Sequence, residues 1–305
     1  MSTRPLRVAL VAEESAGLQT LQGLVALEPA VEIRALLTSA HSERPLVREA
    51  ARKLGIEPAP AELVRSADLA EDLLREEVDL LLNVHSLFVV HPDVVAAPTI
   101  GSFNLHPGPL PEYAGLNVSS WAVYNGEPTH AVTLHWMDAG IDTGPVAWSE
   151  RFELNAADTG LSVSGKCVRL GVPLVARLVQ TALADRDGIP RSEQDRARRR
   201  YFGAGPPDEG RLDWNRPAAE ILRFVRAADY APFTSPWPHP RADLGGTEVG
   251  VAKAVATGRA SSGSPGTVQE LNDDGATVAT ADELVVVQRI WLDGRYSRPA
   301  EALAH

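Results

Sequence analysis

The chain has 305 residues, of which 44% are hydrophobic and 23% are charged, and its formal net charge at pH 7 is −11. This composition is typical of a soluble globular protein, and the length allows one large domain or two ordinary ones. The negative charge disfavours a general nucleic-acid surface, because phosphate binding needs a positive footprint.

The sequence also limits disulfides, metal sites and membrane spans. The single cysteine, Cys167, excludes an internal disulfide framework and a cysteine-based zinc site. His85 and His91 have no carboxylate at a metal-binding spacing, so we expect no metal. No uninterrupted apolar run reaches the roughly 20 residues of a membrane span, and the apolar run near the N-terminus is too short for a secretory signal. We therefore expect a cytoplasmic protein without membrane partners.

The first third of the chain alternates apolar runs with helical periodicity. Near-continuous apolar runs predict buried strands at residues 6–12, 31–37 and 78–84. Apolar residues at helical spacing predict helices at residues 15–27, 44–54 and 66–77. This alternation predicts an α/β fold with a Rossmann-like, mostly parallel sheet and helices on both faces. Neither a G-x-G-x-x-G turn after the first strand nor a P-loop is present, so a familiar dinucleotide or triphosphate site is not supported.

The stretch from Ile100 to Thr143 carries the most chemistry. An apolar run places Asn104 and His106 at alternate positions, and in a strand such residues project from the same face. The prolines that follow end the strand beside His106. A second apolar run, residues 131–137, leads to a turn-prone loop that contains Asp138 and Asp142.

Asparagine, histidine and aspartate together can perform acyl transfer. The amide can donate to a developing oxyanion, the imidazole can exchange a proton near neutral pH, and the carboxylate can orient the imidazole. Ser102 is the nearest hydroxyl nucleophile, but it lies on a strand without an elbow motif. Spacing alone favours an ordinary strand end for Asn104 and His106 and a turn for Asp142.

The rest of the chain predicts a linker and a second domain. An edge strand (145–154) and a long amphipathic helix (159–183) precede a polar linker whose basic cluster is Arg196, Arg198, Arg199 and Arg200. These arginines either face solvent or grip a phosphate of the substrate. A helix at 216–228 and a proline-rich loop at 234–246 follow. Short strands at 249–256, 266–271, 276–281 and 284–292 predict a small open barrel.

Three motifs in this order resemble the 10-formyltetrahydrofolate-dependent formyltransferases. They are Asn104-Leu105-His106, the loop from Leu110-Pro111 to Gly115, and Asp138-Ala139-Gly140-Ile141-Asp142-Thr143-Gly144. The resemblance extends over the whole chain. It implies a catalytic domain at residues 1–185, a linker at 186–214 and an OB-like C-terminal domain at 215–305.

The resemblance also implies roles for individual residues. The catalytic residues would be Asn104, His106 and Asp142. The formyl donor and co-substrate would be N10-formyltetrahydrofolate, in contact with Leu87, Phe88, Val90, Asp138, Gly140 and Ile141. The acceptor would contact the loop residues Pro107, Gly108, Leu110 and Tyr113.

Departures from the family indicate the acceptor. In the tRNA-modifying members that this chain resembles, the catalytic loop carries basic residues. Here the loop carries Glu112, and the net charge of the chain is −11. We therefore expect the amine of a small molecule, such as a nucleotide amino sugar or a hydroxyornithine, with Glu112 and Asp138 forming an acidic pocket for it. A formyltetrahydrofolate hydrolase and a methionyl-tRNA formyltransferase are the enzymatic alternatives. A noncatalytic binding module that uses the loop around Trp237 as an interaction surface is the other rival.

Overall fold

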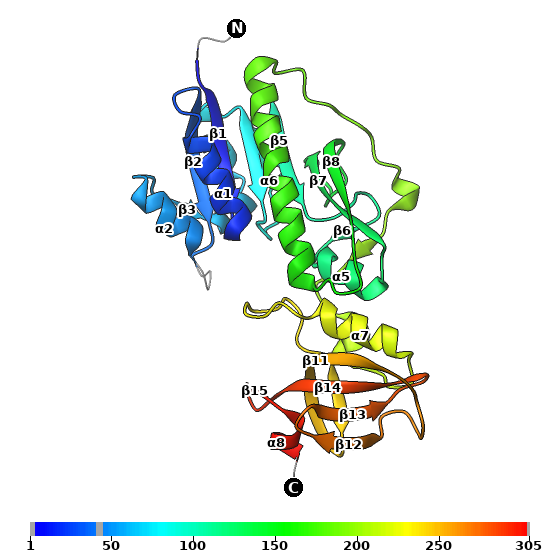
Figure 1. Ribbon diagram of the computed structural model, residues 1–305. Coiled ribbons are helices and arrows are strands. Elements are labelled where there is room, and N and C mark those ends of the chain that lie inside the picture. Colours follow the sequence, from blue (N-terminus) through cyan, green and yellow to red (C-terminus); the bar gives the residue numbers. More distant parts are fainter. Residues whose placement is uncertain (1–3, 41–44, 304–305) are drawn as a thin grey trace. The chain divides into compact units, whose positions relative to one another are not determined.

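The computed structural model describes residues 4–40 and 45–303, which cluster into two compact units (Figure 1). The chain enters each unit more than once. Unit 1 comprises the chain up to Gly115, then Ala131–Phe152 and Lys166–Tyr201. Unit 2 comprises Leu116–His130, Glu153–Gly165 and the chain from Phe202 onward. The domain boundaries at residues 185 and 214 stay a prediction.

Unit 1 is built on a seven-stranded sheet with the order β3-β2-β1-β4-β5-β7-β8. The bounds of its strands are Leu6–Ala12 (β1), Val31–Thr38 (β2), Ala59–Pro60 (β3), Leu80–Val84 (β4), Gly101–His106 (β5), Thr129–Trp136 (β7) and Val146–Glu153 (β8). Strands β1 to β5 pair in parallel, whereas β7 runs antiparallel to β5. The mostly parallel α/β sheet expected from the alternating pattern is confirmed.

Helices cover both faces of this sheet because its central strands carry apolar residues on both faces. In β1, Val8 and Leu10 join one core cluster, whereas Ala9 and Val11 join the other. The first cluster lies under α1 (Glu14–Val25), α2 (Leu46–Lys53) and α6 (Gly160–Ala184), and the second under α3 (Asp68–Arg75) and α4 (Pro92–Ala96). Strands buried on both faces read as continuous apolar runs, which is the signal that the sequence carries.

Among the described residues, α6 is the one helix long and apolar enough to cross a membrane by length and composition. Its Cys167, Leu174 and Leu178 are buried in the first core cluster of unit 1. A Cβ added at Gly171 would lie 2.9 Å from Val132 and 3.1 Å from Leu105, so the helix backbone closely approaches β5 and β7. We therefore assign α6 to the protein core; the cytoplasmic location stays a prediction.

Unit 2 contains an antiparallel sheet with the order β10-β11-β14-β13-β12, and β15 adds to β14. The strand bounds are Arg241–Leu244 (β10), Thr247–Ala260 (β11), Val268–Asn272 (β12), Gly275–Ala279 (β13), Glu283–Leu292 (β14) and Arg295–Ser297 (β15). The helices are α5 (Val118–Asn125), α7 (Ala218–Ala227) and α8 (Pro299–Leu303). Helix α7 packs Ile221, Leu222 and Val225 into the core of this sheet. The separate β-rich C-terminal fold expected from the sequence is confirmed.

Two details of unit 2 differ from the sequence-based expectations. Residues 241–244 form β10, although the stretch reads as a proline-rich loop, because the prolines end at Pro240 and the strand finds its partner in β11. Trp237 is fully buried rather than part of an interaction surface. Its ring packs edge-on against Trp121 at 4.9 Å, and its Nε1–H donates to the Ala204 carbonyl.

The segment Asp185–Tyr201, here called the return segment, runs back along unit 1. At its start, Arg186 donates to the buried carboxylate of Asp79 at 2.8 Å. Arg191 then lies over the ring of Trp136 at 4.3 Å, and Ser192 exchanges two backbone hydrogen bonds with Val146 at the start of β8. These contacts fix the segment to the end of the sheet at which β4, β5 and β8 begin, before it reaches the loops described below.

Asp79 provides a test of this arrangement, because its fully buried carboxylate accepts from Arg4, Arg186, Thr99 and the Arg7 N–H. Asp79→Asn should lower the free energy of unfolding by about 2 kcal/mol, since it removes charge-assisted hydrogen bonds. Asp72→Asn, which alters an exposed ion pair with Arg75, should change it by less than about 0.5 kcal/mol. Urea titration of both variants measures the difference, and equal midpoints would contradict the prediction.

The pH dependence of stability gives a second readout of the same site. Burial raises the pKa of Asp79, but the Arg7 N–H, the Thr99 hydroxyl and the two guanidinium groups lower it by more. The ionised Asp79 carboxylate therefore stabilises the fold fully above the pKa that it has in the unfolded chain, about 3.9. This stabilisation is lost as the pH falls through the lower pKa that Asp79 has in the folded protein. Asp79→Asn should flatten this acid limb of the stability profile.

Candidate active site

Three polar side chains form a row across adjacent strands of unit 1. Asn104 on β5 is in register with Asn83 on β4 and with His135 on β7. The Asn83 amide donates to Asn104 Oδ1 at 3.0 Å, and the Asn104 amide donates to His135 Nε2 at 3.1 Å. His135 keeps its hydrogen on Nδ1, which donates to the Trp136 carbonyl at 2.7 Å. The row therefore orients the Asn104 amide group from both sides.

His106 lies two residues farther along β5, on the same face as Asn104, and is 3% exposed. Its Nε2 is 2.6 Å from the Tyr113 carbonyl. Because a carbonyl can only accept, the hydrogen of the neutral ring lies on Nε2. Nδ1 is therefore the nitrogen that can gain a proton, and it lies 3.6 Å from Asp142 Oδ2.

Asp142 brings its carboxylate to both Asn104 and His106. The side chain is 8% exposed; Oδ1 accepts from the Asn104 amide at 3.3 Å, and Oδ2 accepts from the Gly115 N–H at 2.9 Å. The structure thus brings together the three residues that the sequence nominated. It holds Asp142 in the left-handed backbone region (φ 54°), which non-glycine residues rarely adopt.

The electrostatics keep this carboxylate ionised and the imidazole neutral. Burial raises the pKa of Asp142, but His106, His135 and the Gly115 N–H together bring that pKa well below its usual value. Burial lowers the pKa of His106, and Asp142 and the Tyr113 carbonyl offset only part of this effect. At neutral pH the site therefore combines a carboxylate with an imidazole that can accept a proton at Nδ1.

Glycines and Asp138 shape the loop that delivers Asp142. A Cβ at Gly144 would lie 2.0 Å from the Trp136 carbonyl oxygen, and one at Gly140 would lie 2.1 Å from Thr143 Oγ1. Asp138 Oδ1 accepts from the Gly140 N–H and the Thr143 hydroxyl. The loop starts beside Ser102, where Met137 N–H donates to its carbonyl, and runs back along β5 as far as Asn104.

The return segment supports both loops of the site. Gln194 donates to the carbonyls of Asp142 (3.0 Å) and Gly144 (2.6 Å), and Arg199 donates to the Ile141 carbonyl. Arg200 lies over the Tyr113 ring at 4.8 Å and donates to the Glu112 carbonyl.

The basic cluster of the return segment combines exposed side chains with contacts to unit 1. Arg198 pairs with Glu112, Arg196 lies 3.8 Å from Asp138, and Arg199 and Arg200 contact the loops. The side chains of Arg196 and Arg198 are nevertheless 69% and 64% exposed, so these arginines face solvent, as one of the two interpretations expected. Because both carboxylates have an arginine beside them, Glu112 and Asp138 do not form an unpaired acidic pocket.

The other nominated residues lie in loops around the site. Leu87 is 79% exposed and Ile141 is 45% exposed, whereas Phe88 is partly buried and Val90 lies in the second core cluster. Tyr113 and Gly108 are buried, with the Gly108 carbonyl accepting from Thr133, and Pro107 and Leu110 are partly buried. Their predicted contacts with donor and acceptor stay predictions.

Sequence reasoning missed Asn83 and His135. Each lies in an apolar run, and only the pairing register of β4, β5 and β7 places them beside Asn104. Asn83 Oδ1 and His85 Nε2 are buried without a hydrogen-bond partner among the described residues, which leaves polar atoms for a ligand at the end of β4. Within residues 4–40 and 45–303, no group of three or more His, Cys, Asp and Glu residues is placed to hold a metal ion.

Similar proteins include solved structures of the same fold. An N-formyltransferase from Helicobacter canadensis, in complex with folinic acid and dTDP-3-aminofucose, superposes with a TM-score of 0.66 at 16% identity, covering 93% of this chain and 98% of that one. HypX from Aquifex aeolicus, in complex with tetrahydrofolic acid, superposes with a TM-score of 0.66 at 20% identity, covering 99% of this chain and 47% of that one.

Sequence comparison assigns the family. Methionyl-tRNA formyltransferase of Pseudomonas putida (strain GB-1) is 32% identical over 232 residues, which are 76% of this chain and 71% of that protein. Residues 11–177 match the formyl transferase family, and residues 206–305 match its C-terminal domain. With the matched catalytic region covering more than half of its length, this chain belongs to the formyl transferase family of enzymes.

Proposed function

We propose that the protein is an N-formyltransferase that moves the formyl group of N10-formyltetrahydrofolate to the amine of a small molecule. The observation that carries this proposal is the convergence of Asn104 with the buried side chains of His106 and Asp142. An amide donor, a neutral imidazole and an ionised carboxylate are the groups that formyl transfer to an amine requires.

Asn104 stabilises the negative charge that develops on the formyl oxygen. The acceptor nitrogen attacks the formyl carbon, the carbonyl π electrons move to oxygen, and a tetrahedral intermediate forms. In the free protein the two hydrogens of the Asn104 amide are donated to His135 and Asp142. The oxyanion therefore takes the place of one of these two acceptors, while the hydrogen bond from Asn83 to Asn104 Oδ1 keeps the amide plane in position.

His106 and Asp142 handle the proton that the attacking amine loses. Nδ1 of His106 accepts this proton, and Asp142 Oδ2, 3.6 Å away, stabilises the imidazolium that results. Collapse of the intermediate breaks the bond between the formyl carbon and N10, and the same proton neutralises N10. The products are the formamide and tetrahydrofolate.

The buried polar atoms at the end of β4 suit the donor. Asn83 Oδ1 lacks a hydrogen-bond partner among the described residues, and a pterin ring offers N–H donors of the kind that an amide oxygen accepts. The exposed side chains of Leu87 and Ile141 offer apolar surface for the ring. Folinic acid and tetrahydrofolic acid in the two similar structures support a folate donor for this chain.

The acceptor distinguishes three related activities. A net charge of −11 and the pairing of Arg196 and Arg198 with carboxylates favour a small amine over tRNA. The aminofucose nucleotide in the Helicobacter structure supports the same choice. Methionyl-tRNA formyltransferase is the second candidate, because curated relatives of that function reach 34% identity. Hydrolysis of the donor by water would use the same three residues.

A mass-spectrometric screen separates these activities. The protein is incubated with N10-formyltetrahydrofolate and amines that include nucleotide amino sugars, N-hydroxyornithine and methionyl-tRNA. We expect one small amine to gain about 28 Da, the mass of CO. Modification of methionyl-tRNA alone would establish the second candidate, and formate release without any acceptor would establish the hydrolase.

Variants of the three central residues test the mechanism. Asn104→Ala, His106→Ala and Asp142→Ala should each lower the rate of formyl transfer by about 10²–10³-fold, because each removes a group that acts in the transition state. Binding of tetrahydrofolate, measured by fluorescence titration, should stay largely intact. The control is Asp187→Ala, an exposed aspartate of the return segment, which should keep full activity. Undiminished transfer by any of the three variants would refute the role assigned to that residue.

The pH profile tests the protonation state of His106. Its lowered pKa keeps the ring neutral at neutral pH, so kcat/KM for the donor, at saturating amine, should fall only below about pH 6.5, the ordinary histidine value. Asp142→Asn removes the negative charge that raises the pKa of His106, so the residual activity should show its acid limb at still lower pH. An acid limb above pH 7 in the wild-type protein would contradict the assignment.

A further inference from the structure

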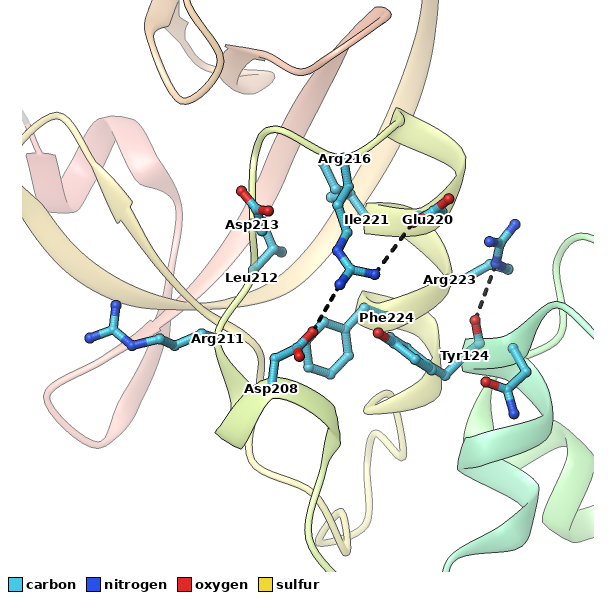
Figure 2. Close-up of a pocket in the computed structure, with 11 residues that line it drawn as sticks. Tyr124, Asp208, Arg211, Leu212, Asp213, Arg216, Glu220, Ile221, Arg223 and Phe224 are labelled. Carbon is cyan, nitrogen blue, oxygen red and sulfur yellow. Dashed lines mark hydrogen bonds and ion pairs between the residues drawn. The ribbon is translucent and has the colours of Figure 1, made fainter. Parts of the chain in front are cut away.

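Unit 2 holds two cavities that share Arg223, and their charges are balanced differently. The first, of about 200 Å³, is shown in Figure 2. There Arg216 pairs with Asp208 at 3.3 Å and with Glu220 at 3.5 Å. The positive charge at the centre of this cavity is therefore neutralised by the protein itself.

The second cavity is larger, about 420 Å³, and lies between the end of α5, the segment before α6, and α7. Its volume is within the range of small-molecule sites. Part of its wall is apolar, from Val123, Pro128, Leu154 and Leu222. Arg223 and Arg226, three residues apart on α7, both line it.

Among residues 4–40 and 45–303, no carboxylate forms an ion pair with Arg226. Its Nε is buried without a hydrogen-bond partner among the described residues, and the side chain is only partly exposed. Burial lowers the pKa of Arg226, and the like charge of Arg223 lowers it further. A partly buried guanidinium beside another cation is unfavourable unless an anion joins it.

The acidic residues of the cavity wall do not supply that anion. Asp158 accepts from the Asn155 N–H at 2.8 Å and from the Ser162 hydroxyl at 2.7 Å. Glu283 accepts from the Gly258 N–H. Neither carboxylate forms an ion pair with Arg226, and only burial and Arg223 determine the direction in which the pKa of Arg226 moves.

Arg223 is held in place through its Nε, so Nη1 and Nη2 of its guanidinium group remain available to a ligand. Its Nε donates to the Tyr124 carbonyl at the end of α5 (Figure 2). A Cβ at Gly126 would lie 2.9 Å from Arg223 Cδ, so this glycine lets the side chain pass close to the backbone. A fixed guanidinium loses little freedom when it binds an oxyanion.

We propose that this second cavity of unit 2 is a binding site for an organic oxyanion, in which Arg226 and Arg223 hold a phosphate or carboxylate group and the apolar wall covers the attached body. The site is separate from the residues of the proposed formyl transfer, and its tests use stability and binding rather than turnover.

The first test measures stability without a ligand. Arg226→Met should raise the midpoint of urea denaturation, because it removes an unpaired, partly buried charge and keeps an apolar side chain of similar length. Arg223→Met should lower the midpoint, because it removes the hydrogen bond to Tyr124. The matched control is Arg259→Met, an exposed arginine of β11, which should leave the midpoint unchanged. A lower midpoint for Arg226→Met would show that the protein already satisfies this side chain and would overturn the proposal.

The second test measures ligand binding by thermal denaturation with phenyl phosphate and benzoate, which share one apolar body, and with inorganic phosphate. At constant ionic strength, phenyl phosphate or benzoate should raise the melting temperature of the wild-type protein and of Arg259→Met. The same concentration should raise that of Arg226→Met far less, with apparent affinity at least tenfold weaker. The comparison with Arg226→Met removes the general stabilising effect of phosphate.

The outcomes separate the possible ligands. A selective response to phenyl phosphate identifies a phosphate site, and one to benzoate identifies a carboxylate site. A response to inorganic phosphate as strong as that to phenyl phosphate would assign the binding energy to the arginines alone. Equal shifts for the wild-type protein and Arg226→Met with every probe would overturn the proposal, whatever the screen for formyl transfer shows.

Discussion

The site depends on one buried carboxylate, that of Asp142, which joins three separate segments. It accepts from Asn104 on β5 and from Gly115 in the next loop, and it faces Nδ1 of His106. An ionised carboxylate with little solvent access must collect such donors to remain charged. The left-handed backbone of Asp142, the glycines beside it and the carbonyl contacts of Gln194 follow from the need to hold this charge in place.

The alternation of strands and helices and the shared face of Asn104 and His106 could be predicted from the sequence, because both depend on local periodicity. The positions of Asn83 and His135 beside Asn104 could not be predicted, because they depend on which strands pair and in which register. β7 runs antiparallel to β5, and the register of this pair places His135 opposite Asn104. Composition also marked the return segment as a linker, since polar residues that contact backbone carbonyls resemble solvated ones in sequence.

Arginines show how far environment, rather than residue type, decides a role. The arginines of the return segment contact loop carbonyls, aromatic rings and carboxylates of unit 1. Arg216 is neutralised by Asp208 and Glu220, whereas Arg226 forms no ion pair within the part of the chain that the structure describes. In an acidic chain, a cation left without a partner in a cavity is more informative than a cluster of cations whose partners are present.

The return segment has a practical consequence for dissecting the enzyme. A truncated catalytic fragment that stops at residue 185, where composition suggests cutting, would lose Arg186, Gln194, Arg199 and Arg200 together. Its seven-stranded sheet would keep every strand, yet the two loops around Asp142 would lack the hydrogen bonds that the return segment donates to them. Limited proteolysis that cleaves within residues 185–201 would inactivate the enzyme by the same route while leaving its helical and strand content nearly intact.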